Sequence, residues 1–191
     1  ADGYQVKADG FGSAGIRVKV EPGKRTKVEV DRTMIAQRLG PVFHVVCAAP
    51  SYLQRHGVPR RPTDLHDHRC LRLLDPVFAD DWHFVGDGVE EVIRPGETFK
   101  VNVAEAMASA AEAGMGICLL PDYVAAPALQ RGTLLRLLPQ YRLQEKQIHA
   151  LYPSRRFLDA KIRTWLDFLA QALPRAFDDY HRVLRDETHW A

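Results

Sequence analysis

From residue 41 onward, the chain alternates short apolar runs with stretches that have the composition of helices. The apolar runs are typical of buried strands, and they read VFHVVC, CLRLL, TFKVN, ICLLP, TLLRLLP and IHALYP. The stretches between them end at glycine, as helices often do, and they read AAPSYLQRHG, VAEAMASAAEAG and YVAAPALQRG. Strands that alternate with helices predict an α/β fold whose sheet is parallel or mixed.

Two local patterns refine this prediction. The segment DWHFVGDGVEEVI contains two alternating runs around Gly86, Asp87 and Gly88, which predicts a β-hairpin. In the helix that follows TFKVN, Asn102 is the expected N-cap, and Glu105 stands at the capping-box spacing.

The last part of the chain is predicted to be helical. An apolar stripe of helical period is formed by Leu158, Ile162, Trp165, Leu166, Leu169 and Leu173. We expect this helix to pack on the sheet. After Pro174 the stripe becomes weaker, and the terminal RDETHWA is expected to fray.

Near the N-terminus, Gly10, Gly12 and Gly15 have the spacing of a dinucleotide-binding fingerprint. That fingerprint requires a helix directly after the glycines, whereas GIRVKVEP alternates apolar and polar residues as a strand does. The glycines therefore predict a turn that opens a hairpin.

Composition and charge exclude several classes of protein. Of the 191 residues, 46% are hydrophobic and 26% are charged, which is ordinary for a soluble domain. The net charge of +2 is far from that of a domain that binds nucleic acid through phosphate contacts, so we expect no direct DNA contact by this chain alone. The three cysteines, Cys47, Cys70 and Cys118, form no CxxC pair, and the sequence contains neither a signal peptide pattern nor a membrane-spanning apolar run. We therefore expect a cytoplasmic protein with no membrane contact.

The sequence offers little for catalysis. The segment HDHRC places His66, His68 and Cys70 at alternate positions, but a tetrahedral zinc site needs further ligands that no second cluster supplies. No nucleophile elbow and no convincing carboxylate pair are found. We predict no catalytic residue, no metal and no cofactor, and a small metallohydrolase is the weakest hypothesis.

A ligand-binding site is better supported. Ligands of open α/β sheets lie beyond the carboxyl ends of strands, where helices begin. The strand at 99–101 leads to Asn102 and to the free backbone amides of Val103, Ala104 and Glu105, which can hold a carboxylate. The alternative is that Asn102 only caps the helix, with Glu105 competing with an anion for the helix dipole.

Several ordered motifs resemble the effector-binding domain of LysR-type transcriptional regulators. They read MIAQRLGPVFHVVCAAPSYLQRHGVPRRPTDLHDHRCLRL, VNVAEAMASAAEAGMGICLLPDYVAAPALQRGTLLRLLP and IHALYPSRRFLDAKIRTWLDFLAQAL, and they cover residues 33–173. The glycines of ADGFGSAGIRV are similar to the strand approach of that family, with residues 19–27 inserted after it.

This resemblance implies a two-lobed module of the periplasmic-binding-protein kind, with mixed sheets. Lobe one would comprise residues 1–50 and 148–175, lobe two residues 51–147, and a C-terminal helical tail residues 176–191. The family's winged helix-turn-helix and its first strand and helix have no counterpart in the sequence, so lobe one would be truncated at its N-terminus.

The resemblance also implies a function. A small effector, which we expect to be a carboxylate, would bind in the cleft between the lobes and control a DNA-bound regulator. The residues that the resemblance carries to the cleft are Cys47, Ala48, Arg72, Asn102, Val103 and Ala104. A homo-oligomer or a full-length regulator is the expected protein partner. The alternative is a truncated interaction or decoy fragment that binds no ligand.

Overall fold

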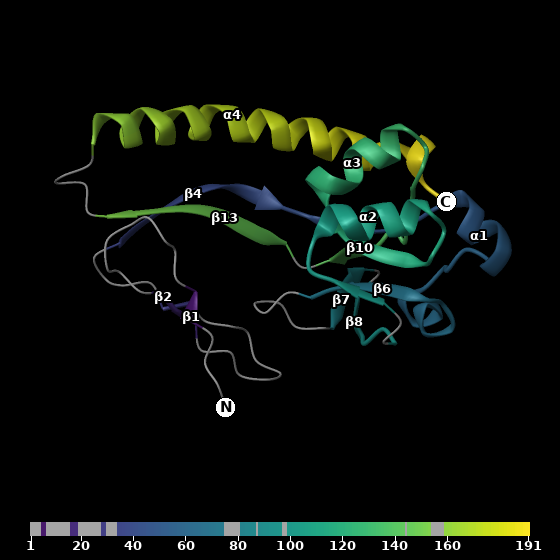
Figure 1. The fold of residues 1–191 in the computed structure, drawn as a ribbon. Coiled ribbons are helices and arrows are strands. Elements are labelled where there is room, and N and C mark those ends of the chain that lie inside the picture. The colour runs from purple at the N-terminus through teal and green to yellow at the C-terminus, as the bar shows by residue number, and fades with distance from the viewer. Residues whose placement is uncertain are drawn as a thin grey trace.

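The fold is built around a mixed five-stranded sheet, which confirms the predicted α/β class (Figure 1). The computed structural model describes residues 5–6, 16–18, 28–29, 34–74, 81–86, 88–96, 99–143, 145–153 and 159–191. The sheet has the strand order β11-β5-β10-β6-β9. Its strands are β5 (His44–Ala48), β6 (Cys70–Leu73), β9 (Phe99–Val101), β10 (Ile117–Pro121) and β11 (Leu135–Leu137). The strand β10 is parallel to β6 and antiparallel to β5, so the sheet combines both kinds of pairing.

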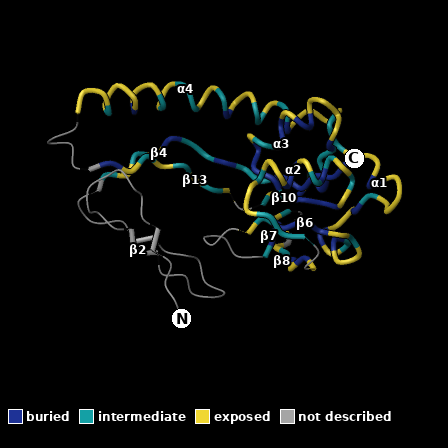
Figure 2. Tube along the Cα trace, in the orientation of Figure 1, coloured by how far each residue is buried: buried dark blue, intermediate teal, exposed yellow. Residues whose placement is uncertain are grey.

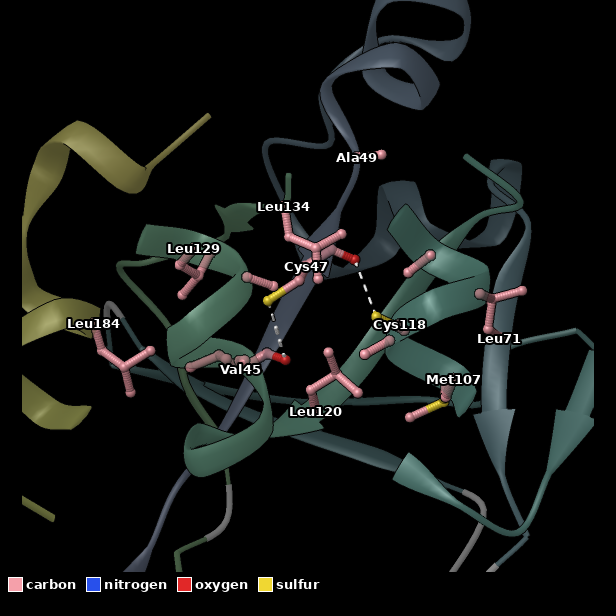
Figure 3. Packing of buried hydrophobic residues seen from close by; sticks show 14 residues of the cluster. Val45, Cys47, Ala49, Leu71, Met107, Cys118, Leu120, Leu129, Leu134 and Leu184 are labelled. Carbon is pink, nitrogen blue, oxygen red and sulfur yellow. Dashed lines mark hydrogen bonds between the residues drawn. The ribbon is translucent and has the colours of Figure 1, made fainter. Parts of the chain in front are cut away.

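Two helices cover one face of this sheet. They are α2 (Ala104–Glu112) and α3 (Asp122–Gln130). Side chains of alternate strand residues point to this face and pack with the helices, as Leu71 and Cys118 do against Met107 (Figure 3). Burying side chains of this size contributes about 1.5–3 kcal/mol each.

The other face carries a second packed layer. It consists of α1 (Pro50–His56), the 3-10 helix η1 (Pro62–Asp67) and a small antiparallel sheet of β12 (Arg142–Leu143), β7 (Trp82–Gly86) and β8 (Val89–Ile93). Tyr52 and Phe84 from these elements pack with Val46 and Cys70 of the central sheet. The predicted hairpin is confirmed by the pairing of β7 with β8.

A long antiparallel ribbon extends from the central sheet. It is formed by β4 (Met34–Val42) and β13 (Lys146–Pro153), in which Val42 is paired with Lys146 and Ile35 with Tyr152. The chain enters the central sheet from β4 and leaves it through β13. These two strands therefore lie side by side where the chain passes between the ribbon and the central sheet (Figure 1).

The helix α4 (Ala160–Arg185) lies along the ribbon and then contacts α3 (Figure 1). Its buried side chains are Leu166, Phe177 and Leu184, and the helix continues through Pro174 into the region where we expected a weaker segment. Trp165 and Phe168 stack on each other and remain 58% and 55% exposed. Exposed positions recur along the whole of α4 (Figure 2). Within the described chain, no helix is both long and apolar enough to cross a bilayer.

A small antiparallel sheet lies near the N-terminus. It consists of β1 (Gln5–Val6), β2 (Ile16–Val18) and β3 (Val28–Glu29), and the alternating segments around β2 and β3 do pair. Gly10, Gly12 and Gly15, as well as residues 19–27, lie outside the described residues.

The C-terminal tail is docked on the sheet, so the expectation that it frays was wrong. The amide of Ala191 donates to the carbonyl of Arg136 on β11 at 3.0 Å, and the indole Nε1 of Trp190 donates to the carbonyl of Leu184 at 3.1 Å. The guanidinium of Arg136 lies 5.7 Å from the centre of the Trp190 ring. The tail thereby covers the edge of β11 that would otherwise be open.

Replacing Trp190 by alanine tests this docking. We expect the free energy of unfolding to fall by about 1–3 kcal/mol, because a hydrogen bond and a cation–π contact are lost together. The matched control is Trp165→Ala, which removes an exposed indole and is expected to change stability by about 0.5 kcal/mol or less. Urea denaturation followed by circular dichroism measures both, and equal losses in the two variants would contradict the docking.

Candidate functional site

The carboxyl ends of three strands meet at one edge of the central sheet. The strands β6, β9 and β10 are parallel, so they end at the same edge, and the antiparallel β5 begins there with His44 opposite Pro121. The amide of Leu74 donates to the carbonyl of Val101 at 2.6 Å, which holds the chain after β6 against the end of β9. This edge lies next to the place where β4 leads into the central sheet and the chain returns from it into β13. A ligand site between two parts of an α/β module is expected at such a place.

The start of α2 presents free backbone amides at this edge. Its N-cap is Val103 rather than the predicted Asn102, and no side chain caps the helix. The first helical hydrogen bond is donated by the amide of Met107 to the carbonyl of Val103 at 3.1 Å, so the amides of Ala104 and Glu105 have no acceptor within the helix. Because Asn102 and Val103 are exposed, an anion can reach these amides.

The capping box that we predicted does not form. An N-cap residue places its side chain over the first turn, and Asn102 lies one residue too early for this. Glu105 stands in the first turn, where its charge favours the helix dipole and competes with any bound anion.

Arg72 lies on β6, next to this edge but inside the protein. Its register partner on β9 is Lys100, and its side chain points to the face that holds Cys70 and the β7–β8 sheet. Arg72 is only 3% exposed and interacts with other residues of the protein. The structure therefore brings Arg72 near Asn102, Val103 and Ala104, while its guanidinium is held below the surface.

Cys47 and Ala48 lie elsewhere, which corrects their expected position in a cleft. They are both 0% exposed, and as consecutive strand residues they point to opposite faces of the sheet. Cys47 packs in the core beneath α2 and α3 (Figure 3), and Ala48 packs in the core on the other face of the sheet. Neither side chain borders the edge at which α2 begins.

The residues of HDHRC do not converge. His66 is exposed, Nδ1 of His68 lies 3.2 Å from the hydroxyl of Tyr52, and the thiol of Cys70 donates to the carbonyl of Leu65 at 3.6 Å. Across the described part of the chain, no three His, Cys, Asp or Glu side chains are grouped as a metal ion requires.

The sequence did not predict a buried carboxyl group at the place where β4 leads into β5. Asp122, the first residue of α3, is 0% exposed, and its Oδ2 accepts a hydrogen bond from the amide of Phe43 at 3.2 Å. Nε2 of His181 on α4 lies 3.3 Å from the same oxygen, and Oδ1 accepts from the amide of Tyr123 at 2.8 Å. The ring of His181 also meets the ring of Phe43 edge to face at 4.6 Å. This cluster ties α3, the start of β5 and α4 together.

His44, beside this cluster, is an uncharged and partly buried histidine. Its Nδ1 is buried and has no hydrogen-bond partner among the described residues. Burial lowers the pKa of His44 from 6.5 to about 4, and the positive charge of Lys146 acts in the same direction. The side chain is therefore neutral at physiological pH.

The cysteine thiols are buried and protonated. Burial raises the pKa values of Cys47 and Cys70 to about 12, and it raises that of Cys118 as well. The thiol of Cys118 donates to the carbonyl of Cys47 at 3.6 Å (Figure 3). Thiols in this state are poor nucleophiles.

Comparisons with known proteins give one consistent family. Residues 23–174 match the family described as the LysR substrate binding domain. An uncharacterized HTH-type transcriptional regulator of Haemophilus influenzae is 32% identical over 134 residues, which are 69% of this chain and 46% of that protein. The chain thus spans about half the length of the curated relatives that it matches.

Solved structures agree with this result. The regulatory domain of CrgA from Neisseria meningitidis, described as a LysR-type transcriptional regulator, has a TM-score of 0.67 and 28% identity, over 75% of this chain and 70% of that one. The full-length Vibrio cholerae virulence activator AphB has a TM-score of 0.67 and 26% identity, over 75% of this chain and 49% of that one.

His44 predicts a dependence of stability on pH. Because the pKa in the folded state lies below the ordinary value of 6.5, the unfolded state takes up a proton first, and stability falls as the pH drops from about 6.5 to about 4. Relative to His44→Gln, the wild type should lose up to about 3 kcal/mol more between pH 7 and pH 4. The control His149→Gln removes an exposed histidine and should retain the wild-type slope. Denaturation at several pH values measures this, and parallel curves for wild type and His44→Gln would contradict it.

The thiols predict slow alkylation. At pH 8, native protein should react with iodoacetamide at least about a hundredfold more slowly than protein unfolded in guanidinium, as measured by mass spectrometry. Ser109→Cys, which adds an exposed thiol on α2, should gain one label rapidly in the native state. Rapid labelling of the native wild type would show that the cores open readily.

Proposed function

Because this chain belongs to the LysR substrate-binding domain family, we propose that it senses a small carboxylate for a transcriptional regulator. Members of this family are regulatory domains rather than enzymes. The observation that supports a carboxylate is the start of α2, where exposed backbone amides without helical acceptors lie at the carboxyl edge of the sheet. The amides and the positive end of the helix dipole together favour an anion.

The proposed site is centred on Asn102, Val103 and Ala104. The Asn102 side chain is exposed one residue before the N-cap, so it is free to contact a ligand instead of capping the helix. Arg72 contributes positive potential from the neighbouring strand, and its side chain is already engaged within the protein. Cys47 and Ala48 are left out of this proposal because they are enclosed in the cores.

We also propose how binding becomes a signal. The central sheet with its covering layers forms one lobe, and the ribbon with most of α4 contributes to the other. Since β5 pairs with β10 and β11, we place the lobe boundary at Val42–His44 and Leu143–Lys146 instead of after residue 50. A ligand that binds better to one arrangement of the lobes shifts the population toward it by its difference in affinity.

The partners follow from this role. Within a complete regulator, this domain would bind the effector, assemble with further copies, and leave DNA contact to another part of the protein. The cytoplasm is the compartment in which such a regulator would work. A fragment that binds no ligand, the alternative considered above, is not favoured by any contact described here.

Calorimetry with a panel of small aromatic and aliphatic carboxylates tests the proposal. We expect saturable heat with at least one member. Glu105→Gln should tighten binding about two- to fivefold because it removes the competing charge, and Asn102→Asp should weaken binding by a similar factor.

The matched control is Glu90→Gln, which removes an exposed carboxylate on β8 and should leave the affinity unchanged. Circular dichroism shows whether each variant is folded. Two results would overturn the proposed site. One is a folded wild type that gives no saturable heat, and the other is wild-type affinity in both Glu105→Gln and Asn102→Asp.

A further inference from the structure

We propose that a second, separate small-molecule site lies where α4 packs beside the end of β4, and that it takes an α-amino acid zwitterion with an apolar side chain. A pocket of about 500 Å³ is formed there between the end of β4, Phe43 and the middle of α4. This volume lies within the range of small-ligand pockets. The site is distinct from the start of α2, because none of the pocket's lining residues belongs to α2.

The base of the pocket is apolar and aromatic. Phe43 and Phe177 line it, and Phe177 is only 5% exposed. The ring of Phe177 lies so close to Gly40 that a Cβ at this position would be 2.3 Å from its Cε2 atom. The absence of a side chain at Gly40 therefore lets α4 and β4 approach each other, and two aromatic rings form a surface that suits an apolar side chain.

Two side chains of opposite charge also line the pocket. Arg38 comes from β4 and Asp178 from α4, and both are exposed. Neither makes a hydrogen bond or an ion pair with any residue in the described part of the chain. By contrast, the neighbouring Asp179 pairs with Arg182 at 3.1 Å, so an unpartnered aspartate is not a general property of this turn of the helix.

The remaining titratable side chain that lines the pocket is His181, whose Nε2 is buried. His181 lies 3.3 Å from the buried carboxylate of Asp122. Among the described residues that line the pocket, a ligand therefore meets one cation and one anion without a protein partner, together with two aromatic rings. A simple carboxylate would gain from Arg38 and be repelled by Asp178, whereas an α-carboxylate and an α-ammonium on one molecule satisfy both through charge-assisted hydrogen bonds.

Calorimetry with leucine, N-acetyl-leucine and leucinamide tests this assignment on the full chain. We expect saturable binding of leucine and affinities at least about tenfold weaker for both blocked compounds, because each lacks one charge. Arg38→Gln and Asp178→Asn should each weaken leucine binding by about tenfold or more.

Combining compounds with variants assigns each contact. In Asp178→Asn, acetylation of the amine should no longer reduce the affinity, and in Arg38→Gln, amidation of the carboxylate should no longer do so. The matched controls are Arg175→Gln and Asp167→Asn, which remove exposed charges of α4 outside the pocket and should bind leucine as the wild type does.

Three results would overturn the proposal: no saturable heat with folded protein, wild-type affinity in both pocket variants, or N-acetyl-leucine binding as tightly as leucine. Leucine and N-acetyl-leucine are themselves aliphatic carboxylates, so the variants decide which site gives the heat. Heat that Arg38→Gln and Asp178→Asn reduce and that Asn102→Asp leaves unchanged belongs to this pocket, whereas heat that only Asn102→Asp reduces belongs to the start of α2 and would overturn the present proposal.

Discussion

The arrangement of this domain depends on one buried carboxylate. Asp122 is fully enclosed, accepts hydrogen bonds from the amides of Phe43 and Tyr123, and lies 3.3 Å from Nε2 of His181. A buried polar group is stable only when such partners replace the lost water. These partners come from the start of β5, from α3 and from α4, so the carboxyl group of Asp122 holds these three elements together. Both proposed ligand sites border this fixed region.

Most elements of the fold could be predicted because they are encoded locally. Short apolar runs form strands, and β7 and β8 form the predicted hairpin. Both could be predicted because hydrophobic periodicity and turn-forming residues determine structure within a few positions of the chain. The long helix was also predicted, with a weaker apolar stripe after Pro174 and a helical tail at 176–191, and the structure joins these parts in one helix. Phe177 and Leu184 are buried beyond that proline, and their packing against the ribbon and the sheet outweighs the local cost of proline in a helix.

The candidate sites were harder to predict because they depend on distant contacts. Phe43 and Asp122 are 79 residues apart, and no local pattern marks either as part of a cluster. Cys47 and Ala48 were expected at a cleft because of the family resemblance alone. Their burial depends on α2 and α3 covering one face of the central sheet and on the second layer covering the other. Asn102 was predicted as a cap from its residue type, but the cap position is set by where the backbone turns, one residue later.

The buried contacts around Asp122 also determine which parts of the domain can move. Near Asp122 the ribbon and α4 are held by buried polar contacts and by the close approach of Phe177 to Gly40. Farther along, the described part of the ribbon consists of two strands, and α4 exposes Trp165 and Phe168, so fewer buried contacts resist displacement there. If the two proposals hold, a ligand at the start of α2 would act on the sheet, and a ligand between β4 and α4 would act where β4 leads into the sheet. Both places adjoin the segment that is held most firmly, so a small difference in binding energy there would change the angle between the ribbon and the sheet.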